Sequence, residues 1–286
     1  MSIITLTSDM GLQDYYVGSL KGFILRQYPE ARLIDISHSV QPFNILQAAF
    51  FLRNCISDFP EGTIHLIAVN SEPVINFGRP EDGKFPSIMK FKGQYFVSTD
   101  NGFFSLLLKD AEPEKIYRID GAVSSPAALR YPAKNILAKA AAQLASGIPA
   151  DEIGEEVDYF NKAFAVNAVI EENLLKGTVI HIDHYGNAIT NITEDLFKRV
   201  GNDEPFTIYF RRKEYYIDEI SHAYGDVPEG EKLALFNSGG YLEIAINKGV
   251  SGNGGGANSL FGLHINDIVR IEFSPRGSRS TLESLF

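Results

Sequence analysis

The apolar pattern of this chain changes once, near residue 174, and this change limits the folds that it can adopt. Before it, apolar stretches alternate between strand and helix spacing, as in a short strand at 3–6, a helix at 15–28 and a buried strand at 63–69. This alternation predicts a mostly parallel sheet covered by helices. After it, short strands recur between turns without long helices, which is typical of a small antiparallel barrel or sandwich. The sequence therefore predicts an α/β N-terminal domain and an all-β, barrel-like C-terminal domain.

The predicted domain organisation has four parts. Residues 1–165 form the N-terminal α/β domain, 166–173 cross between the domains, 174–273 form the C-terminal β-barrel domain, and 274–286 are a polar tail. A chain of 286 residues is long enough for more than one hydrophobic core, which favours two domains. The acidic stretch 151–173 is expected to be irregular.

Charge and cysteine content narrow the expected partners and location. The formal net charge of -10 argues against nucleic acid, because phosphate binding relies on clustered Lys and Arg. A single cysteine, Cys55, allows no disulfide within the chain and favours a reducing compartment. No apolar run approaches the length of a membrane span, and the N-terminus shows no secretion signal. We expect a cytoplasmic enzyme or binding protein with no membrane partner.

A polar turn divides the apolar stretch 179–192, which reads VIHIDHYGNAITNI. The turn carries Asp183, Tyr185 and Asn187 between two alternating strands. A fold seldom needs a carboxylate, an aromatic ring and a carboxamide on one strand–turn–strand unit, whereas a site for a polar, flat ligand does. Asn beside Gly in a turn is also commonly structural. Both interpretations of this turn stay open.

Other candidate side chains follow predicted strands of the N-terminal domain, where ligands of parallel sheets bind. Asp9 is suited to accept hydrogen bonds from a vicinal diol such as a ribose. Asp14, closer to the next helix, is better explained as a helix N-cap. Asp35 and His38 suit a metal or an acid–base pair, although a turn with a hydrogen-bonded histidine is the favoured interpretation. Phe43 suits either ligand stacking or core packing.

Two further motifs have structural alternatives. His181, Asp183 and His184 suggest zinc, but His184 does not share the strand face of the other two and no fourth ligand is evident, so no metal is expected. In the turn 237–241, Ser238 and the backbone amides suit a carboxylate ligand, and a plain hairpin turn is nearly as good an explanation. The glycine stretch 249–262 lacks the spacing and terminal Lys of a phosphate loop.

Six segments, in this order, resemble the S-adenosyl-L-methionine hydroxide adenosyltransferase (DUF62) family, which is related to the fluorinases and chlorinases. They are TSDMGLQDYYVGSLKG, IDISHSVQPFNI, FPEGTIHLIAV, STDNG, IDHYGNAITNI and NSGGYLEIA. The resemblance covers roughly residues 3–273. It implies an N-terminal α/β domain, a C-terminal β-barrel and a homotrimer whose ligand lies between the N-domain of one subunit and the C-domain of its neighbour. No cofactor is implied apart from S-adenosyl-L-methionine or adenosine as substrate or ligand.

The resemblance also implies a reaction and the residues around the ribose. Asp9 would bind the ribose hydroxyls, and Phe43 matches an aromatic position that lines the site. Water or hydroxide would attack the ribose C5′, and methionine would leave as a neutral thioether. The sulfonium already carries the positive charge, so the leaving group needs no acid.

In the C-terminal domain the resemblance implies contacts to both ends of the ligand. Asp183 would hold the methionine ammonium, and Ser238 would help to hold the carboxylate. Asn187 would hydrogen-bond the adenine, with Tyr185 and Tyr224 stacking on it. The polar turn then becomes half of a nucleoside site.

The residues that handle water in the family, an Asp-Arg-His set, are all changed here. Their positions are occupied by Asn70, Phe77 and Pro132. Candidate substitutes are Glu72, Arg79 and Lys134. Gly239 also stands where halogenating relatives carry an Arg.

Three functions follow from retained binding positions and changed water-handling positions. The first is an S-adenosyl-L-methionine hydrolase that forms adenosine. The second is a catalytically silent protein that binds S-adenosylmethionine or adenosine. The third is adenosyl transfer to another nucleophile. A metal hydrolase built on His181, Asp183 and His184 is the remote alternative.

Overall fold

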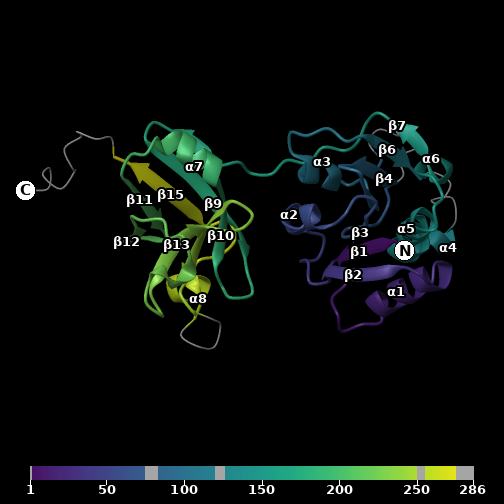
Figure 1. Ribbon diagram of the computed structural model, residues 1–286, viewed down its shortest axis with the longest axis horizontal. Helices are drawn as coiled ribbons and strands as arrows, with labels where there is room; N and C mark the ends of the chain where they lie inside the picture. The colour runs from purple at the N-terminus through teal and green to yellow at the C-terminus, as the bar shows by residue number, and fades with distance from the viewer. Residues whose placement is uncertain (1, 75–82, 120–125, 250–254, 275–286) are drawn as a thin grey trace, which may run out of the picture. The chain divides into compact units, whose positions relative to one another are not determined.

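The computed structural model describes residues 2–74, 83–119, 126–249 and 255–274 (Figure 1). The chain divides into two compact units, Met1–Ala165 and Val166–Phe286. The first unit is α/β with a mostly parallel sheet, and the second is an antiparallel, barrel-shaped sheet, which confirms the predicted fold class. None of the described helices is both long and apolar enough to cross a membrane.

The first unit contains a seven-stranded sheet in the order β2-β1-β3-β5-β4-β6-β7. The strands are β1 (Ile3–Ser8), β2 (Arg32–Ser37), β3 (Ile64–Ala68), β4 (Pro86–Phe91), β5 (Gln94–Thr99), β6 (Lys115–Arg118) and β7 (Glu155–Val157). Neighbours among β2, β1, β3 and β5 are parallel, whereas β4, β6 and β7 pair antiparallel. The chain runs from β1 to β2 on one side and then to β3 on the other. The carboxyl ends of β1 and β3 therefore flank a topological switch point, where ligands of such sheets bind.

Helices cover both faces of this sheet (Figure 1). They are α1 (Tyr16–Gln27), α2 (Ile45–Arg53), η1 (Ile56–Asp58), α3 (Phe103–Leu108), α4 (Pro126–Leu129), the π-helix η4 (Ala133–Ala138), α5 (Lys139–Ala145) and α6 (Ala150–Ile153). Helix α1 buries Leu20 and Ile24, four residues apart on one helix face, in the core that α5 shares. Helices α2 and α3 bury Leu52 and Phe104 in a second core. The two faces of the sheet thus have separate apolar cores.

Two glycines shape the chain near the end of this unit. Gly147, with a φ of 94°, follows α5, and its N–H donates to the Leu144 carbonyl at 3.0 Å, as a glycine C-cap does. The irregular structure predicted for 151–173 is confirmed for 158–168 and wrong for the two ends of the stretch, where α6, β7 and β8 (Val169–Glu171) lie. A Cβ on Gly154 would lie 2.7 Å from the Arg118 carbonyl oxygen, so glycine allows the chain to approach β6 and pair with it.

The second unit is an antiparallel sheet in the order β12-β11-β15-β9-β10-β14-β13, with β8 paired to β9. The strands are β9 (Leu174–Ile182), β10 (Ala188–Thr193), β11 (Phe206–Phe210), β12 (Arg212–Ile217), β13 (Lys232–Phe236), β14 (Tyr241–Ile246) and β15 (Ile268–Phe273). The sheet curls far enough for the Lys232 ammonium on β13 to lie 5.9 Å from the centre of the Tyr216 ring on β12. It encloses one apolar core.

The sequence did not predict the eight-residue helix α7 (Glu194–Gly201). Thr193 caps it by accepting a hydrogen bond from the Leu196 N–H at 3.3 Å, and Asn202 ends it with a φ of 46°. The Phe197 ring packs 5.0 Å from the Phe206 ring and anchors the helix on the barrel. Two shorter elements, η5 (Tyr224–Asp226) and α8 (Ala257–Phe261), complete the unit.

Candidate functional site

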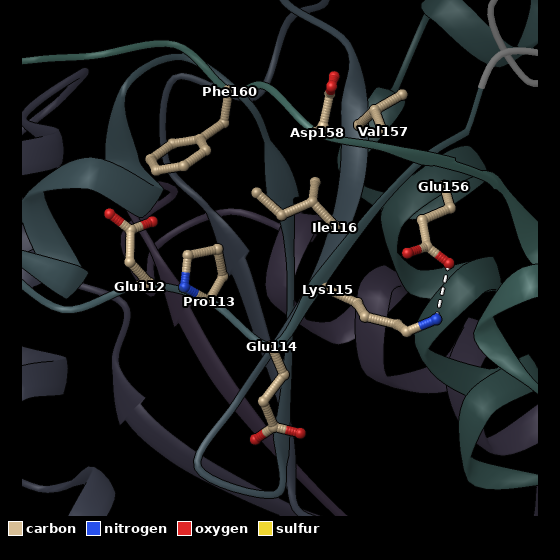
Figure 2. A pocket seen from close by; sticks show the side chains of 9 residues that line it. All are labelled: Glu112, Pro113, Glu114, Lys115, Ile116, Glu156, Val157, Asp158 and Phe160. Atoms are coloured by element: carbon tan, nitrogen blue, oxygen red, sulfur yellow. Dashed lines mark hydrogen bonds and ion pairs between the residues drawn. The ribbon is translucent and has the colours of Figure 1, made fainter.

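A pocket of about 610 Å³ lies along β6 and β7 of the first unit (Figure 2). Its acidic lining includes Glu112, Glu114, Glu156 and Asp158, and Lys115 is paired with Glu156 at 2.8 Å. None of the residues predicted to bind a ligand lines this pocket. The candidate site is therefore built from loops at the carboxyl ends of the parallel strands in the first unit and from turns of the barrel in the second unit, and the two units are considered separately.

Asp9 joins three loops at the switch point of the first unit. Its Oδ2 accepts hydrogen bonds from the Phe43 N–H at 2.8 Å and from the Asn70 N–H at 3.2 Å. Both donors have a positive φ, 65° at Phe43 and 48° at Asn70. Asn adopts this conformation at little cost, whereas Phe does so rarely, so the carboxylate stabilises an uncommon backbone shape. Oδ1 carries neither bond and is the oxygen available to a ligand.

The loop that contains Asn70 has a second support, which the sequence interpretation missed. Asn101 donates from Nδ2 to the Asn70 carbonyl at 2.8 Å, and its Oδ1 accepts from the Phe103 N–H. Thr99 Oγ1 donates to the Ser71 carbonyl at 2.7 Å. The signal was present in the Asp-Asn-Gly turn directly after β5, at the same edge of the sheet as Asp9.

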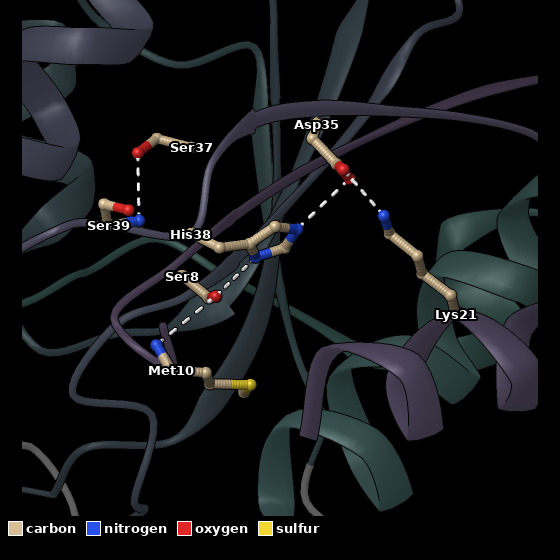
Figure 3. Close-up of polar contacts among 7 residues, drawn as sticks. All are labelled: Ser8, Met10, Lys21, Asp35, Ser37, His38 and Ser39. Atoms are coloured by element: carbon tan, nitrogen blue, oxygen red, sulfur yellow. Dashed lines mark hydrogen bonds and ion pairs between the residues drawn. The ribbon is translucent and has the colours of Figure 1, made fainter. Parts of the chain in front are cut away.

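A hydrogen-bond chain runs from two buried side chains, Ser8 and His38, to the exposed Asp35 and to Lys21 (Figure 3). His38 Nδ1 lies 2.7 Å from Ser8 Oγ, His38 Nε2 lies 3.1 Å from Asp35 Oδ1, and Lys21 Nζ lies 2.6 Å from Asp35 Oδ2. Because a carboxylate only accepts, Nε2 carries the hydrogen in the neutral imidazole and Nδ1 accepts from Ser8. Burial opposes ionisation of Asp35, but the bonds from Lys21 and His38 outweigh it and lower the pKa of that carboxyl. The interpretation of His38 as a hydrogen-bonded histidine is confirmed.

Backbone bonds tie the loops after β1 and β2 together around this chain. The Gly11 N–H donates to the His38 carbonyl at 2.8 Å, and the Val40 N–H donates to the Ser8 carbonyl at 3.3 Å. The prediction that Asp14 caps α1 is wrong, because Tyr15 occupies the N-cap position and no side chain accepts a bond there. The cause is that the helix begins one residue later than an Asp14 cap requires.

Pro132 occupies a buried position immediately before the π-helix η4. Lys134, on that helix, lies with Nζ 3.4 Å from Ser19 Oγ and 5.2 Å from the centre of the Tyr131 ring. Its ammonium is therefore held against α1 and an aromatic face.

Of the other two candidate substitutes, only Glu72 lies in the described ranges. Glu72 is exposed, and within the described ranges no hydrogen bond or ion pair links it to Lys134. Phe77 and Arg79 lie outside the described residues. A water-handling role for these side chains stays a prediction.

In the second unit, Asp183 organises its own turn between β9 and β10. Its Oδ1 accepts from the N–H groups of Tyr185 at 2.9 Å and Asn187 at 2.8 Å, and its Oδ2 accepts from Asn187 Nδ2 at 3.2 Å. Since the carboxylate can only accept, the Asn187 amide must turn its NH₂ towards it. Asn187 Oδ1 is then buried without a hydrogen-bond partner among the described residues.

Tyr224 lies near this turn. The pKa of the Tyr224 hydroxyl is raised, most strongly by burial. Its hydrogen bond to Glu243 and the nearby Asp183 and Tyr185 raise it further. Tyr185 is 58% exposed and Tyr224 is 43% exposed, so both rings are accessible for stacking. The structure thus brings Asp183, Tyr185, Asn187 and Tyr224 into one region of the barrel.

The turn between β13 and β14 holds the predicted carboxylate-binding residue. Asn237 Oδ1 accepts from the N–H groups of Gly239 at 3.0 Å and Tyr241 at 3.2 Å. Ser238 and Gly239 are exposed at the tip of this turn. Binding of a carboxylate by Ser238 stays a prediction.

Two polar groups near the Asp183 turn are accounted for by the fold. Asn191 Oδ1 accepts from the Thr178 N–H at 2.8 Å. Burial lowers the pKa of His181, which favours its neutral form. In the part of the chain that the structure describes, no three His, Cys, Asp or Glu side chains are placed to hold a metal ion.

Comparison with protein-family models matches both units. The S-adenosyl-L-methionine (SAM) hydroxide adenosyltransferase N-terminal domain matches residues 4–154, and the C-terminal domain of the same family matches residues 177–270. The chain belongs to the SAM hydroxide adenosyltransferase family. The resemblance drawn from the six sequence segments is confirmed.

Members of this family with similar sequences include hydrolases and halogenating enzymes. An (R)-S-adenosyl-L-methionine hydrolase from Methanocaldococcus jannaschii is 33% identical over 254 residues, which cover 86% of this chain and 88% of the relative. One from Thermus thermophilus is 28% identical, covering 87% and 93% of the two chains. A fluorinase from Actinopolyspora mzabensis is 25% identical, covering 86% and 90%. The crystal structure of an uncharacterized conserved protein from Thermotoga maritima matches with a TM-score of 0.81 and 31% identity, over 94% of this chain and 99% of that one.

Proposed function

We propose that this protein hydrolyses S-adenosyl-L-methionine to adenosine and L-methionine. The observation that carries the proposal is the match of both units to SAM hydroxide adenosyltransferase domains, together with 33% identity to a relative named as such a hydrolase. The position of Asp9 adds support, because one of its carboxylate oxygens is available at the switch point of the sheet.

The reaction is a displacement at the ribose C5′. The water oxygen forms a bond to C5′, the C5′–S bond breaks, and sulfur takes the bonding electron pair. Methionine leaves as a neutral thioether and the attacking water loses a proton. The protein has to align water with the C–S bond and exclude bulk solvent, and it does not have to protonate the leaving group.

We assign ligand contacts to residues in each of the two units. Asp9 Oδ1 accepts from the ribose hydroxyls, and Asn187 Oδ1 accepts from the exocyclic amine of adenine. The remaining contacts are the stacking rings Tyr185 and Tyr224, the ammonium ligand Asp183, the carboxylate ligand Ser238 and the lining residue Phe43. The net charge of -10 also favours a sulfonium cation over an anionic ligand.

A catalytically silent binding protein is the second candidate, and Asn70 is the observation that favours it. The carboxamide of Asn70 cannot act as a carboxylate base at a position where the family has Asp. Incubation with S-adenosylmethionine, followed by chromatography for adenosine and methionine, separates the candidates. Products above the uncatalysed background support hydrolysis. Tight binding by calorimetry without products supports the silent protein, and a different adenosyl product supports transfer to another nucleophile.

We also infer that the working form is a cytoplasmic homotrimer. Leu12, Tyr15 and Phe43 are 71%, 72% and 69% exposed in the single chain, and exposed apolar side chains of this size favour cover by a ligand or another subunit. Light scattering of the purified protein should give about three times the 31.7 kDa chain mass. A mass of one chain would contradict the trimer.

A further inference from the structure

Glu243 is a carboxylate in an otherwise apolar strand. It lies in β14, whose sequence is YLEIAI, and is 2% exposed. Its register neighbours are Ile189 on β10 and Leu235 on β13. A carboxylate is seldom buried unless it is paired or fully hydrogen-bonded, so its partners show why it is tolerated here.

The two oxygens of Glu243 hold two different parts of the candidate site. Oε1 accepts from the Tyr224 hydroxyl at 2.6 Å, and Oε2 accepts from Asn237 Nδ2 at 3.1 Å. The bond to Oε2 fixes the orientation of the Asn237 amide, because a carboxylate only accepts. Asn237 Oδ1 can then accept from the Gly239 and Tyr241 N–H groups and shape the turn that carries Ser238.

We propose that Glu243 is a positioning residue that holds the Tyr224 ring and the Ser238 turn in one arrangement for the ligand. The proposal rests on the proposed function, because it assigns the ring to the purine and the turn to the carboxylate. Glu243 itself touches neither part of the ligand. It acts through Tyr224 on one side and through Asn237 on the other.

Substitutions separate the two connections. Tyr224→Phe keeps the ring and removes only the bond to Oε1. Glu243→Leu removes both acceptors and leaves the Tyr224 hydroxyl and the Asn237 amide without this partner, so it also lowers stability. Tyr216→Phe, on β12, is the matched control, because Tyr216 is also about half exposed but makes no contact with Glu243.

The measurement is calorimetric affinity for adenosine and for S-adenosylhomocysteine, which carries the methionine-like carboxylate but no sulfonium to be cleaved. Tyr224→Phe should weaken adenosine binding roughly tenfold, the size expected for one hydrogen bond to a charged group. Glu243→Leu should do the same for adenosine and weaken S-adenosylhomocysteine further, because the Ser238 turn is also released. The double variant Tyr224→Phe/Glu243→Leu should bind adenosine as tightly as Tyr224→Phe alone, because Glu243 acts on the ring only through the hydroxyl that Tyr224→Phe removes.

Additive losses in this cycle would show that Glu243 acts only on general stability and would overturn the proposal. Affinities equal to wild type for Tyr224→Phe would overturn it as well, and this variant keeps the core intact if Glu243→Leu does not fold. In both cases hydrolysis of S-adenosylmethionine by the wild type would still stand. If the wild type binds neither adenosine nor S-adenosylhomocysteine, the proposed function fails and this proposal fails with it.

Discussion

Substitution of Asp9 should affect both the shape of the site and its affinity, to different degrees. Asp9 Oδ2 accepts two backbone hydrogen bonds, at 2.8 and 3.2 Å. Bonds to a charged group contribute about 1.5–3 kcal/mol each, and the half-buried position of Asp9 favours the lower end of that range. Asp9→Ala should therefore lower the free energy of unfolding of the first unit by about 3 kcal/mol. Asp9→Asn keeps an acceptor oxygen and loses only the charge, so about 1 kcal/mol is expected.

The affinity for adenosine should fall to a similar extent in Asp9→Ala and Asp9→Asn, although the two variants differ in stability. The Asp9→Asn side chain can hold the loops through one oxygen, and its NH₂ then replaces the acceptor that faces the ribose diol. We expect adenosine affinity to fall at least tenfold in both variants, as for loss of a hydrogen bond to a charged group. Asp14→Asn on the same loop is the control, because Asp14 is exposed and caps no helix.

Hydrogen–deuterium exchange of peptides from β1 and β3, followed in urea, measures the free energy of unfolding of the first unit separately. Calorimetry measures the affinity for adenosine. Unchanged exchange in Asp9→Ala would refute the view that this carboxylate holds the loops that carry Phe43 and Asn70. Unchanged adenosine affinity in Asp9→Asn would remove Asp9 from the ribose site.

Three further predictions concern buried titrations and the Asp183 turn. Burial lowers the pKa of His65 from 6.5 to about 4. Below pH 6.5 the unfolded state therefore binds more protons at this residue than the native state does. The free energy of unfolding should fall by about 3 kcal/mol as the pH falls from 6.5 towards 4. Urea titrations of His65→Gln should lack this loss, and an unchanged pH profile would contradict the assignment. Burial raises the pKa of Asp100 to about 6 from 3.8, so stability should rise by about 3 kcal/mol as pH falls from above 6 to 3.8. The effects of His65 and Asp100 on the free energy of unfolding oppose each other between pH 4 and 6. Asp100→Asn should therefore lose more stability than wild type as the pH falls through this range in the same titration. An equal loss would contradict the raised pKa of Asp100. Asp183→Ala should weaken S-adenosylmethionine binding by roughly 1.5–3 kcal/mol in calorimetry, and an unchanged affinity would exclude Asp183 from the site.

The sequence predicts the fold well where spacing alone decides the structure. The strand ends that place Asp9 and Asn70 at one edge of the sheet follow from the alternation of strands and helices. Helix α7 was missed because its apolar residues are few and because Phe197 packs on the rings of Phe236 and Phe273, which are distant in sequence. The strand β7 was missed because it depends on the close approach at Gly154.

Site chemistry was harder to predict, because one carboxylate can serve the fold and a ligand together. Asp183 was expected either to shape a turn or to bind a ligand, and the structure shows that it shapes the turn. The same carboxylate also fixes the orientation of the Asn187 amide, and residue spacing does not reveal this. Glu243 was missed for the same reason, since its partners Tyr224 and Asn237 come from other segments of the barrel.

The most direct test of the central claim follows the oxygen that reaches C5′. The protein is incubated with S-adenosylmethionine in water enriched in ¹⁸O, and the adenosine formed is analysed by mass spectrometry. Water attack at C5′ predicts adenosine that carries ¹⁸O in its 5′-hydroxyl, together with one methionine per adenosine. Absence of enzyme-dependent adenosine, or adenosine without the label, would contradict the account.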